Sequence, residues 1–363
     1  MIRVLHYGLG SKLGGIETYL YKLYKNIDRE NFQFDFLTNK GEKSCFYDEF
    51  IDMGSNFYSI TSRNKNLIRN RSELKNLLLK EKFDIIHCHM NSLSYSTPIL
   101  MGLKTNSKVI VHSRNASTPK SLKTRFLHNY NSIILPKNKV KMLSVSDYAG
   151  DWMFGSKANY TVINNGVDTT KFMFNMDNRK KIRKELNLEN QFCIIHVGAF
   201  RTQKNHIFLL EIFKYLKKYK SNSKLLLVGD GKLRVDIERE IENMGIKENV
   251  VILGNRSDIS DLLAGGDAFL FPSHYEGFPN AVLEAQTSGL PCLISDTITK
   301  EVLINDNCYE FSLKSSAKEW AEKLLSIKKN DDRYDGAERI LDKGFSVNSE
   351  INKIEDIYKN LIR

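Results

Sequence analysis

The chain has 363 residues, of which 41% are hydrophobic, 27% charged and 10% aromatic, as in folded globular proteins rather than in disordered chains. Its uncharged apolar runs are far shorter than the about 20 residues of a membrane-spanning helix, and we expect no secretory signal because the N-terminus passes directly into a strand pattern. Five scattered cysteines without a Cys-x-x-Cys pair argue against a disulfide scaffold or a structural zinc site and fit a reducing cytoplasm.

The formal net charge of +11 is concentrated in the first half of the chain. Residues 1–175 hold 25 basic and 14 acidic residues, whereas residues 176–363 hold 29 basic and 29 acidic residues. No acidic residue lies between Asp84 and Asp147, and the basic residues of this stretch are Lys104, Lys108, Arg114, Lys120, Lys123, Arg125, Lys137, Lys139 and Lys141. We interpret the stretch as a surface that attracts anionic partners, such as nucleic acid, phospholipid head groups or phosphorylated substrates.

Short apolar runs alternate with amphipathic stretches along the whole chain. Most runs are continuous in Val, Ile, Leu and Phe, which is typical of strands buried on both faces of a parallel sheet. The predicted strands are 2–7, 32–38, 85–89, 108–112, 142–145 and 160–163, followed by 192–197, 224–228, 250–253, 268–271 and 291–295. The alternation predicts a doubly wound α/β architecture, and the number of strands favours two sheets, with a seam near the turn-rich segment 164–168.

A glycine-rich turn follows the first strand and contains Gly8, Gly10, Gly14 and Gly15. Glycines let a backbone approach a ligand closely, and the N–H groups of a following helix attract anions. The turn is not a dinucleotide fingerprint, because Leu13 stands where Gly-x-Gly-x-x-Gly requires glycine, and no Gly-Lys-Ser/Thr of a P-loop follows. A ligand loop and a purely structural turn are equally compatible with this pattern.

Two further strand ends carry polar residues. His112 ends a buried strand, at the edge where open α/β sheets bind ligands, although a structural histidine fits the same position. Arg201 and Lys204 lie in the loop after the strand 192–197, and two cations there suit a diphosphate, although exposed basic loops are common.

The most specific motif runs from Ser273 to Pro291. A buried strand ends, a loop carries Glu276, and Pro279 opens a helix whose first N–H groups, from Asn280 to Val282, are expected to meet phosphate oxygens. Glu284 lies one turn after Asn280 on the same face of this helix, about 6 Å along the helix axis.

At this motif the sequence resembles the retaining glycosyltransferases of family 4, which have the GT-B architecture. The family's Glu-x7-Glu signature matches Glu276 and Glu284, and the resemblance covers essentially the whole chain. More narrowly, the sequence resembles the bacterial branch of this family, which builds capsular polysaccharides and exopolysaccharides. The other matching segments are 14–17, 165–168, 228–231 and 253–256.

The resemblance implies two Rossmann-like, doubly wound parallel-sheet domains that face a central cleft. Residues 1–165 are expected to bind the acceptor and residues 166–345 the nucleotide sugar, with a C-terminal helix in 346–363 returning to the first domain.

The resemblance also implies roles for individual residues. Glu284 binds ribose hydroxyls, Glu276 contacts sugar hydroxyls, Lys204 neutralises the diphosphate, and His112 lies beside the transferred sugar. The family's partner arginine is replaced by Ala199, so Arg201 is expected to substitute for it. The other expected donor-site residues are Gly14, Gly15, Asn255, Arg256, Gly277, Phe278, Pro279, Asn280, Ala281 and Val282.

The expected activity is transfer of a sugar from a nucleotide sugar, a UDP-sugar, to a lipid-linked glycan acceptor with retention of anomeric configuration. No Asp-x-Asp occurs in the chain, so we expect no metal and no other cofactor, with protein cations in the metal's place. The basic first half leads us to expect a cytoplasmic protein that is peripheral on the anionic inner face of the cell membrane.

Parts of the sequence also fit three other functions. A dinucleotide-dependent oxidoreductase would need the glycine that Leu13 replaces. A nucleic-acid-binding protein would interleave aromatic residues with its basic run, but residues 91–141 contain only Tyr95, Phe126 and Tyr130, so we expect no nucleic-acid partner. A nucleotide-sugar epimerase of the same fold remains an alternative function, and dependence of the reaction on an acceptor would distinguish a transferase from it.

Overall fold

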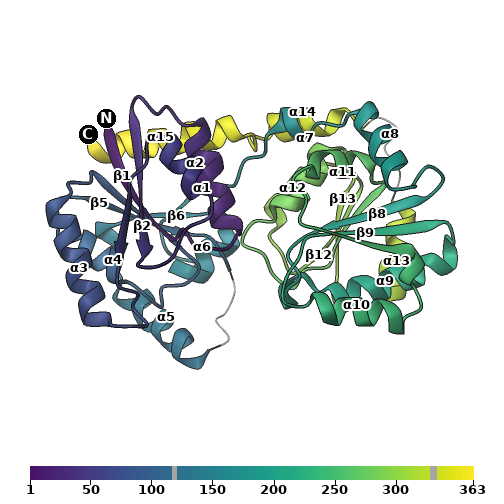
Figure 1. The fold of residues 1–363 in the computed structure, drawn as a ribbon, viewed down its shortest axis with the longest axis horizontal. Coiled ribbons are helices and arrows are strands. Elements are labelled where there is room, and N and C mark those ends of the chain that lie inside the picture. Colours follow the sequence, from purple (N-terminus) through teal and green to yellow (C-terminus); the bar gives the residue numbers. More distant parts are fainter. Residues whose placement is uncertain (117–120, 328–332) are drawn as a thin grey trace. The chain divides into compact units, whose positions relative to one another are not determined.

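A computed structural model describes residues 1–116, 121–327 and 333–363, so Lys120 of the basic stretch lies outside the described residues. The chain divides into two compact units (Figure 1). The first unit comprises Met1–Asn165 and Val347–Arg363, and the second comprises Gly166–Ser346.

The first unit is built on a seven-stranded sheet with the order β3-β2-β1-β4-β5-β6-β7. Its strands are β1 (Ile2–Tyr7), β2 (Phe32–Asn39), β3 (Phe57–Ile60), β4 (Ile85–Met90), β5 (Lys108–Ser113), β6 (Lys141–Ser144) and β7 (Thr161–Val162). Its helices are α1 (Gly15–Asn26), α2 (Tyr47–Asp52), α3 (Leu67–Lys80), α4 (Thr97–Gly102), α5 (Leu122–Ile134), α6 (Asp147–Phe154) and α15 (Val347–Ile362). The strand pairs of this sheet are parallel, which places their carboxyl ends at one edge.

The second unit repeats this design with a six-stranded sheet of order β10-β9-β8-β11-β12-β13, again with parallel pairs. Its strands are β8 (Phe192–Val197), β9 (Ser223–Val228), β10 (Val250–Gly254), β11 (Ala268–Phe271), β12 (Cys292–Ser295) and β13 (Cys308–Phe311). Its helices are α7 (Thr169–Phe172), α8 (Met176–Glu185), α9 (His206–Tyr219), α10 (Arg234–Asn243), α11 (Ile259–Gly265), α12 (Asn280–Thr287), α13 (Ala317–Ser326) and α14 (Asp335–Asp342). Two doubly wound parallel sheets confirm the predicted fold class.

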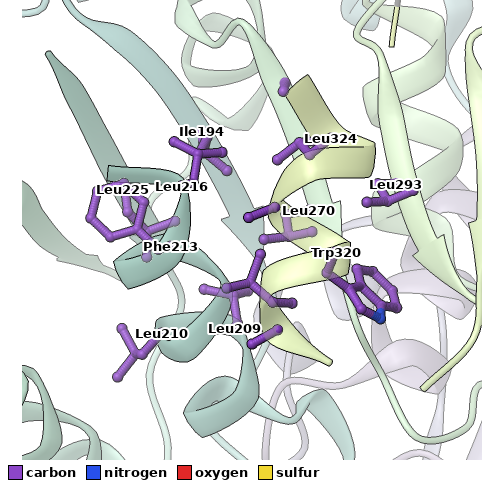
Figure 2. Close-up of a cluster of buried hydrophobic side chains, with 14 of the residues drawn as sticks. Ile194, Leu209, Leu210, Phe213, Leu216, Leu225, Leu270, Leu293, Trp320 and Leu324 are labelled. Carbon is purple, nitrogen blue, oxygen red and sulfur yellow. The ribbon is translucent and has the colours of Figure 1, made fainter. Parts of the chain in front are cut away.

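Each sheet is buried between layers of helices. In the first unit α1 and α15 cover one face, where Tyr19 and Tyr358 pack with Phe34, while α3, α4 and α6 cover the other. In the second unit α9, α10 and α13 pack their apolar side chains on one face of the sheet. Figure 2 shows this cluster, in which Phe213 and the fully buried Trp320 lie over strand residues such as Leu270. Continuous apolar strands are therefore explained by cover on both faces.

The sequence patterns missed two strands, β3 and β13, and each of them is the outermost strand of its sheet. Both have four residues, and in each only one residue is fully buried, Ile60 in β3 and Cys308 in β13. Edge position alone does not hide a strand, because the edge strand β10 was predicted from its apolar run 250–253. In the four-residue strands β3 and β13 a polar residue, Ser59 or Glu310, interrupts the apolar run and leaves too little signal.

Helix α13 begins with a capping box, in which the hydroxyl of Ser316 accepts a hydrogen bond from the backbone N–H of Glu319 and the carboxylate of Glu319 accepts one from the N–H of Ser316. We expect Ser316→Ala to lower the free energy of unfolding of the second unit by about 1 kcal/mol, because an N–H group loses its acceptor. Ser326→Ala, at the exposed end of the same helix, is the control and should change it by less than about 0.5 kcal/mol in urea unfolding followed by circular dichroism. Equal effects of the two changes would contradict the role of the cap.

Candidate functional site

The strand order reverses direction between β8 and β11 in the second unit, and open α/β sheets bind ligands outside the carboxyl ends of the strands at such a point. The loop after β8 carries Arg201 and Lys204, and the loop after β11 carries Glu276. The two loops are fastened to each other: Gln203 donates a hydrogen bond to the carbonyl of Tyr275, and the amide of His274 donates to the carbonyl of Gln203, both at 2.8 Å. The fold thus holds the two loops together at the carboxyl ends of β8 and β11, where open α/β sheets bind ligands.

Lys204 and Glu276 form an ion pair, with 2.8 Å between Nζ and Oε1. The lysine side chain is 16% exposed and the glutamate side chain 10% exposed, and Nζ lies 4.4 Å from the centroid of the Phe271 ring. A charged pair with little access to water is more strongly coupled than a surface pair. The arrangement presents one ammonium and one carboxylate side by side, which suits a ligand that carries both an anionic group and hydroxyl groups.

Two histidines lie beneath this pair. A Cβ atom at Gly198 would stand 3.0 Å from the side chain of Lys204 and 3.1 Å from the ring of His196. Gly198, Lys204 and His196 are therefore tightly packed. Burial, with the nearby charge of Lys204, lowers the pKa of His206 to about 4 and the pKa of His196 well below its ordinary value. Both rings are therefore neutral at pH 7. The sequence assigns no role to His196 or His206, because nothing in their local pattern indicates proximity to Lys204.

Helix α12 begins after Pro279, with Gly277 and Phe278 buried and the Phe278 ring stacked on Phe345 at 5.8 Å. Two of the amides predicted to meet phosphate oxygens have acceptors within the loop and the first turn. The N–H of Asn280 donates to the carbonyl of Phe278 at 3.1 Å, and that of Val282 donates to the carbonyl of Pro279 at 3.0 Å. An anion at these two amides would compete with local carbonyls, because the first turn of the helix is tightened.

The remaining residues predicted for the second unit lie at different depths. Glu284 and Ala281 are half-buried on α12, Asn255 is exposed, and the side chain of Arg201 is exposed. Arg256 is held by Asp258 at 2.6 Å and by Glu185 at 3.1 Å, and the hydrogen bond from Arg256 lowers the pKa of Asp258. Arg256 therefore has carboxylate partners within its own unit.

The glycine-rich turn of the first unit already contains a carboxylate. The N–H of Gly10 donates to Oε1 of Glu17 at 2.8 Å, and a Cβ at Gly14 would lie 2.8 Å from Oε2 of the same residue. Nothing lies within 4 Å of a Cβ at Gly15. A side chain at Gly14 would displace the Glu17 carboxylate, whose hydrogen bond to Gly10 gives the turn a structural reason of its own.

His112 lies on β5, fully buried, in a chain of hydrogen-bonded side chains. Tyr358 of α15 lies 2.7 Å from Nδ1 of His87, Nε2 of His87 lies 3.1 Å from Nδ1 of His112, and Nε2 of His112 lies 3.3 Å from Arg114. Burial lowers the pKa values of His87 and His112 well below the ordinary value. A neutral His112 donates one hydrogen bond through one ring nitrogen and accepts one through the other, and it is not a cation in this setting.

Three histidines of this cluster lie close enough to be metal ligands, because one ring nitrogen each of His6, His87 and His89 falls within 4.8 Å of the others. Nδ1 of His6 and Nε2 of His89 are hydrogen-bonded at 3.0 Å, and both nitrogens of His87 are engaged by Tyr358 and His112. A metal bound through His87 would have to break one of its two bonds, whereas Nε2 of His6 and Nδ1 of His89 have no hydrogen-bond partner among the described residues. The geometry is that of a buried hydrogen-bond network.

Two families match the chain in succession. Residues 13–171 match the family described as Glycosyltransferase Family 4, and residues 178–340 match the family described as Glycosyl transferases group 1.

Relatives match over most of their length. EpsF of Bacillus subtilis is 31% identical to this chain, and the match covers 83% of this chain and 80% of EpsF. The Escherichia coli UDP-Gal:alpha-D-GlcNAc-diphosphoundecaprenol alpha-1,3-galactosyltransferase is 26% identical and covers 99% of this chain and 97% of that protein. The capsular polysaccharide biosynthesis glycosyltransferase CapH of Staphylococcus aureus is 27% identical and covers 99% of both.

Solved structures share the fold. Anabaena Alr3699/HepE in complex with UDP and glucose has a TM-score of 0.80 at 16% identity and covers 99% of this chain and 100% of that chain. WaaG, described as a glycosyltransferase involved in lipopolysaccharide biosynthesis, has a TM-score of 0.74 at 16% identity and covers 98% of this chain and 99% of that chain.

Proposed function

Because this chain belongs to the GT-B glycosyltransferases, with a family 4 and a group 1 domain, we propose that it transfers a hexose from a UDP-sugar to a lipid-linked glycan acceptor, with retention of anomeric configuration. Its role would be the synthesis of a cell-surface polysaccharide. The named activity of the E. coli relative and the name of CapH support the acceptor and the process. The fold that the chain shares with HepE, solved with UDP, supports the donor.

The observation that carries the proposal is the Lys204–Glu276 pair at the crossover point of the second sheet. Donor transfer breaks the bond between the anomeric carbon and a diphosphate oxygen, so negative charge grows on the departing diphosphate. Lys204 would stabilise that charge, with Arg201 as a second cation, and Glu276 would accept hydrogen bonds from sugar hydroxyls. These cations would take the place of a metal ion.

In the proposed reaction the acceptor hydroxyl attacks the anomeric carbon from the face that the diphosphate leaves. Its oxygen forms the new glycosidic bond, and its proton passes to the departing diphosphate oxygen. We assign the acceptor and His112 to the first unit and the donor to the second, with Asn255 and Arg256 toward the base. Retention is tested by the anomeric coupling constant of the product in NMR, and an inverted product would contradict the proposed geometry.

The donor is tested by thermal-shift measurements with a panel of nucleotide sugars, because a ligand that binds only the folded state raises the melting temperature by mass action. The hits are then assayed with a polyprenyl-diphosphate glycan as acceptor. Stabilisation by UDP-sugars and transfer that depends on the acceptor are expected. Conversion of the donor sugar without any acceptor would instead indicate an epimerase.

We expect Glu284→Ala to weaken UDP binding by about 10- to 100-fold, because a carboxylate that accepts two ribose hydroxyls contributes the energy of charge-assisted hydrogen bonds. Binding of uridine should weaken by the same factor, since the ribose is common to both. Glu238→Ala on the exposed side of α10, where Glu238 pairs with Arg234, is the matched control. Calorimetric titration that shows unchanged affinity for Glu284→Ala would place the ribose elsewhere.

A further inference from the structure

Helix α5 of the first unit turns its apolar side away from the protein. Its large side chains Leu122, Phe126, Tyr130, Ile133 and Ile134 are 82%, 69%, 52%, 80% and 47% exposed, respectively. The spacing of four, four, three and one residues places them on one face of a helix. An amphipathic helix of a globular protein normally buries such a face, so α5 is oriented the opposite way.

The polar side of α5 is what holds it to the rest of the unit. His128 is buried, accepts a hydrogen bond from the N–H of Leu93 at 3.0 Å and stacks on Trp152 at 4.3 Å between ring centroids. The amide of Asn131 donates to the carbonyl of Leu93 at 2.6 Å. These bonds involve side chains roughly opposite the apolar face, so they define the rotation of the helix and keep that face outward.

The charged residues of α5 and of the segments that flank it in sequence have one sign. Lys123 and Arg125 are exposed on α5 itself, Lys139 is exposed just beyond it, and no acidic residue occurs anywhere between Asp84 and Asp147. A face of Leu, Ile and Phe bordered by cations has the composition of helices that lie in the interface of anionic membranes. Nucleic acid would use the cations but would leave three aliphatic side chains in water.

The length of α5 agrees with lying on a membrane rather than crossing it. Thirteen residues extend about 20 Å, well short of the about 30 Å of the hydrocarbon layer. Among the helices of the described residues, none is both long enough and apolar enough to span a bilayer.

We propose that the outward face of α5 inserts into the interface of a bilayer that contains anionic phospholipids and that it is the membrane anchor of this protein. Leu122, Phe126 and Ile133 enter the acyl boundary, and Lys123 and Arg125 contact lipid phosphates. A lipid-linked acceptor requires that the enzyme attach to the membrane surface, and the proposal assigns this attachment to α5. It rests on the proposed function only in this respect.

The test is co-sedimentation of the full chain with vesicles of phosphatidylcholine alone or with one quarter phosphatidylglycerol. The unmodified protein should bind the anionic vesicles, bind neutral ones much less, and be released by salt. Leu122→Ser/Phe126→Ser/Ile133→Ser should weaken binding at least about tenfold, since each exposed apolar side chain contributes to insertion. Lys123→Gln/Arg125→Gln should weaken it about 30-fold, since each cation near the surface contributes about 1 kcal/mol.

A matched control removes three equally exposed apolar side chains from another helix, α3. Leu67, Ile68 and Leu79 are 56%, 84% and 59% exposed, and Leu67→Ser/Ile68→Ser/Leu79→Ser should leave vesicle binding unchanged. In a separate variant, Phe126→Trp, the new indole should shift its emission to the blue on anionic vesicles and be quenched by brominated acyl chains.

Three results would overturn the proposal: no binding to anionic vesicles, an equal loss of binding in the α3 control, or an α5 variant that turns a dimer into a monomer in light scattering. The last result would make the face an interface between two copies. None of these measurements uses a sugar donor or acceptor, so they remain interpretable even if the proposed transfer activity is not found.

Discussion

Replacing Lys204 with alanine is expected to reduce sugar transfer by about 100- to 1,000-fold, the range found when one group that stabilises developing charge is removed from an active site. The same change should weaken UDP binding but leave uridine binding almost unchanged, because the lysine would contact the diphosphate and not the nucleoside. Titration calorimetry with UDP and uridine separates these contributions. Unchanged affinity for UDP would remove Lys204 from the donor site.

The ion pair complicates a single substitution, and a double-mutant cycle resolves it. Lys204→Ala leaves Glu276 poorly exposed and without its partner at 2.8 Å, so the melting temperature should fall as well. Glu276→Gln removes the charge while keeping the shape, and it should abolish transfer with the fold intact. Adding Glu276→Gln to Lys204→Ala should recover part of the lost stability but none of the activity. Lys214→Ala, an exposed lysine on α9, is the control and should change neither.

The first unit is expected to lose stability steeply as the pH falls below about 6.5. His6, His87, His89 and His112 are fully buried, and burial lowers the pKa of His6 to about 3 and the pKa values of the other three well below the ordinary value. In the unfolded chain each would titrate near 6.5, so below that pH the unfolded state binds protons that the folded state does not. Each histidine then lowers the free energy of unfolding by about 1.4 kcal/mol per pH unit, or by about 5.5 kcal/mol for the four, until the pH reaches its folded pKa.

Calorimetry between pH 7.5 and 5 should therefore show a strong decrease in the free energy of unfolding of the first unit, with uptake of about four protons from this cluster. His6 packs against Phe34 at 4.1 Å between ring centroids, so His6→Phe should fit the site and reduce the uptake by about one proton. A free energy of unfolding that stays constant from pH 7 to 5.5 would show that the cluster is protonated or solvated in the folded state.

Much of the fold follows from local sequence patterns. Continuous apolar runs predict the central strands, because a strand covered on both faces needs apolar side chains in both directions, as in β11, where all four residues are apolar and buried. The Glu-x7-Glu motif places Glu276 and Glu284 on one loop and helix, a relationship that depends only on nearby residues. The edge strands β3 and β13 lack this signal because each is only four residues long and contains a polar residue, Ser59 or Glu310.

The central strands and the candidate residues of the site were thus predicted from the sequence alone, because helix and strand periodicity and loop chemistry act over a few residues. The contacts that define the site were decided only by the tertiary structure. Lys204 and Glu276 stand 72 residues apart and meet because β8 and β11 are neighbours, Glu17 enters the glycine turn that had been predicted for a ligand, and His128 turns the apolar side of α5 outward. Each of these depends on packing between distant segments, which no local pattern encodes.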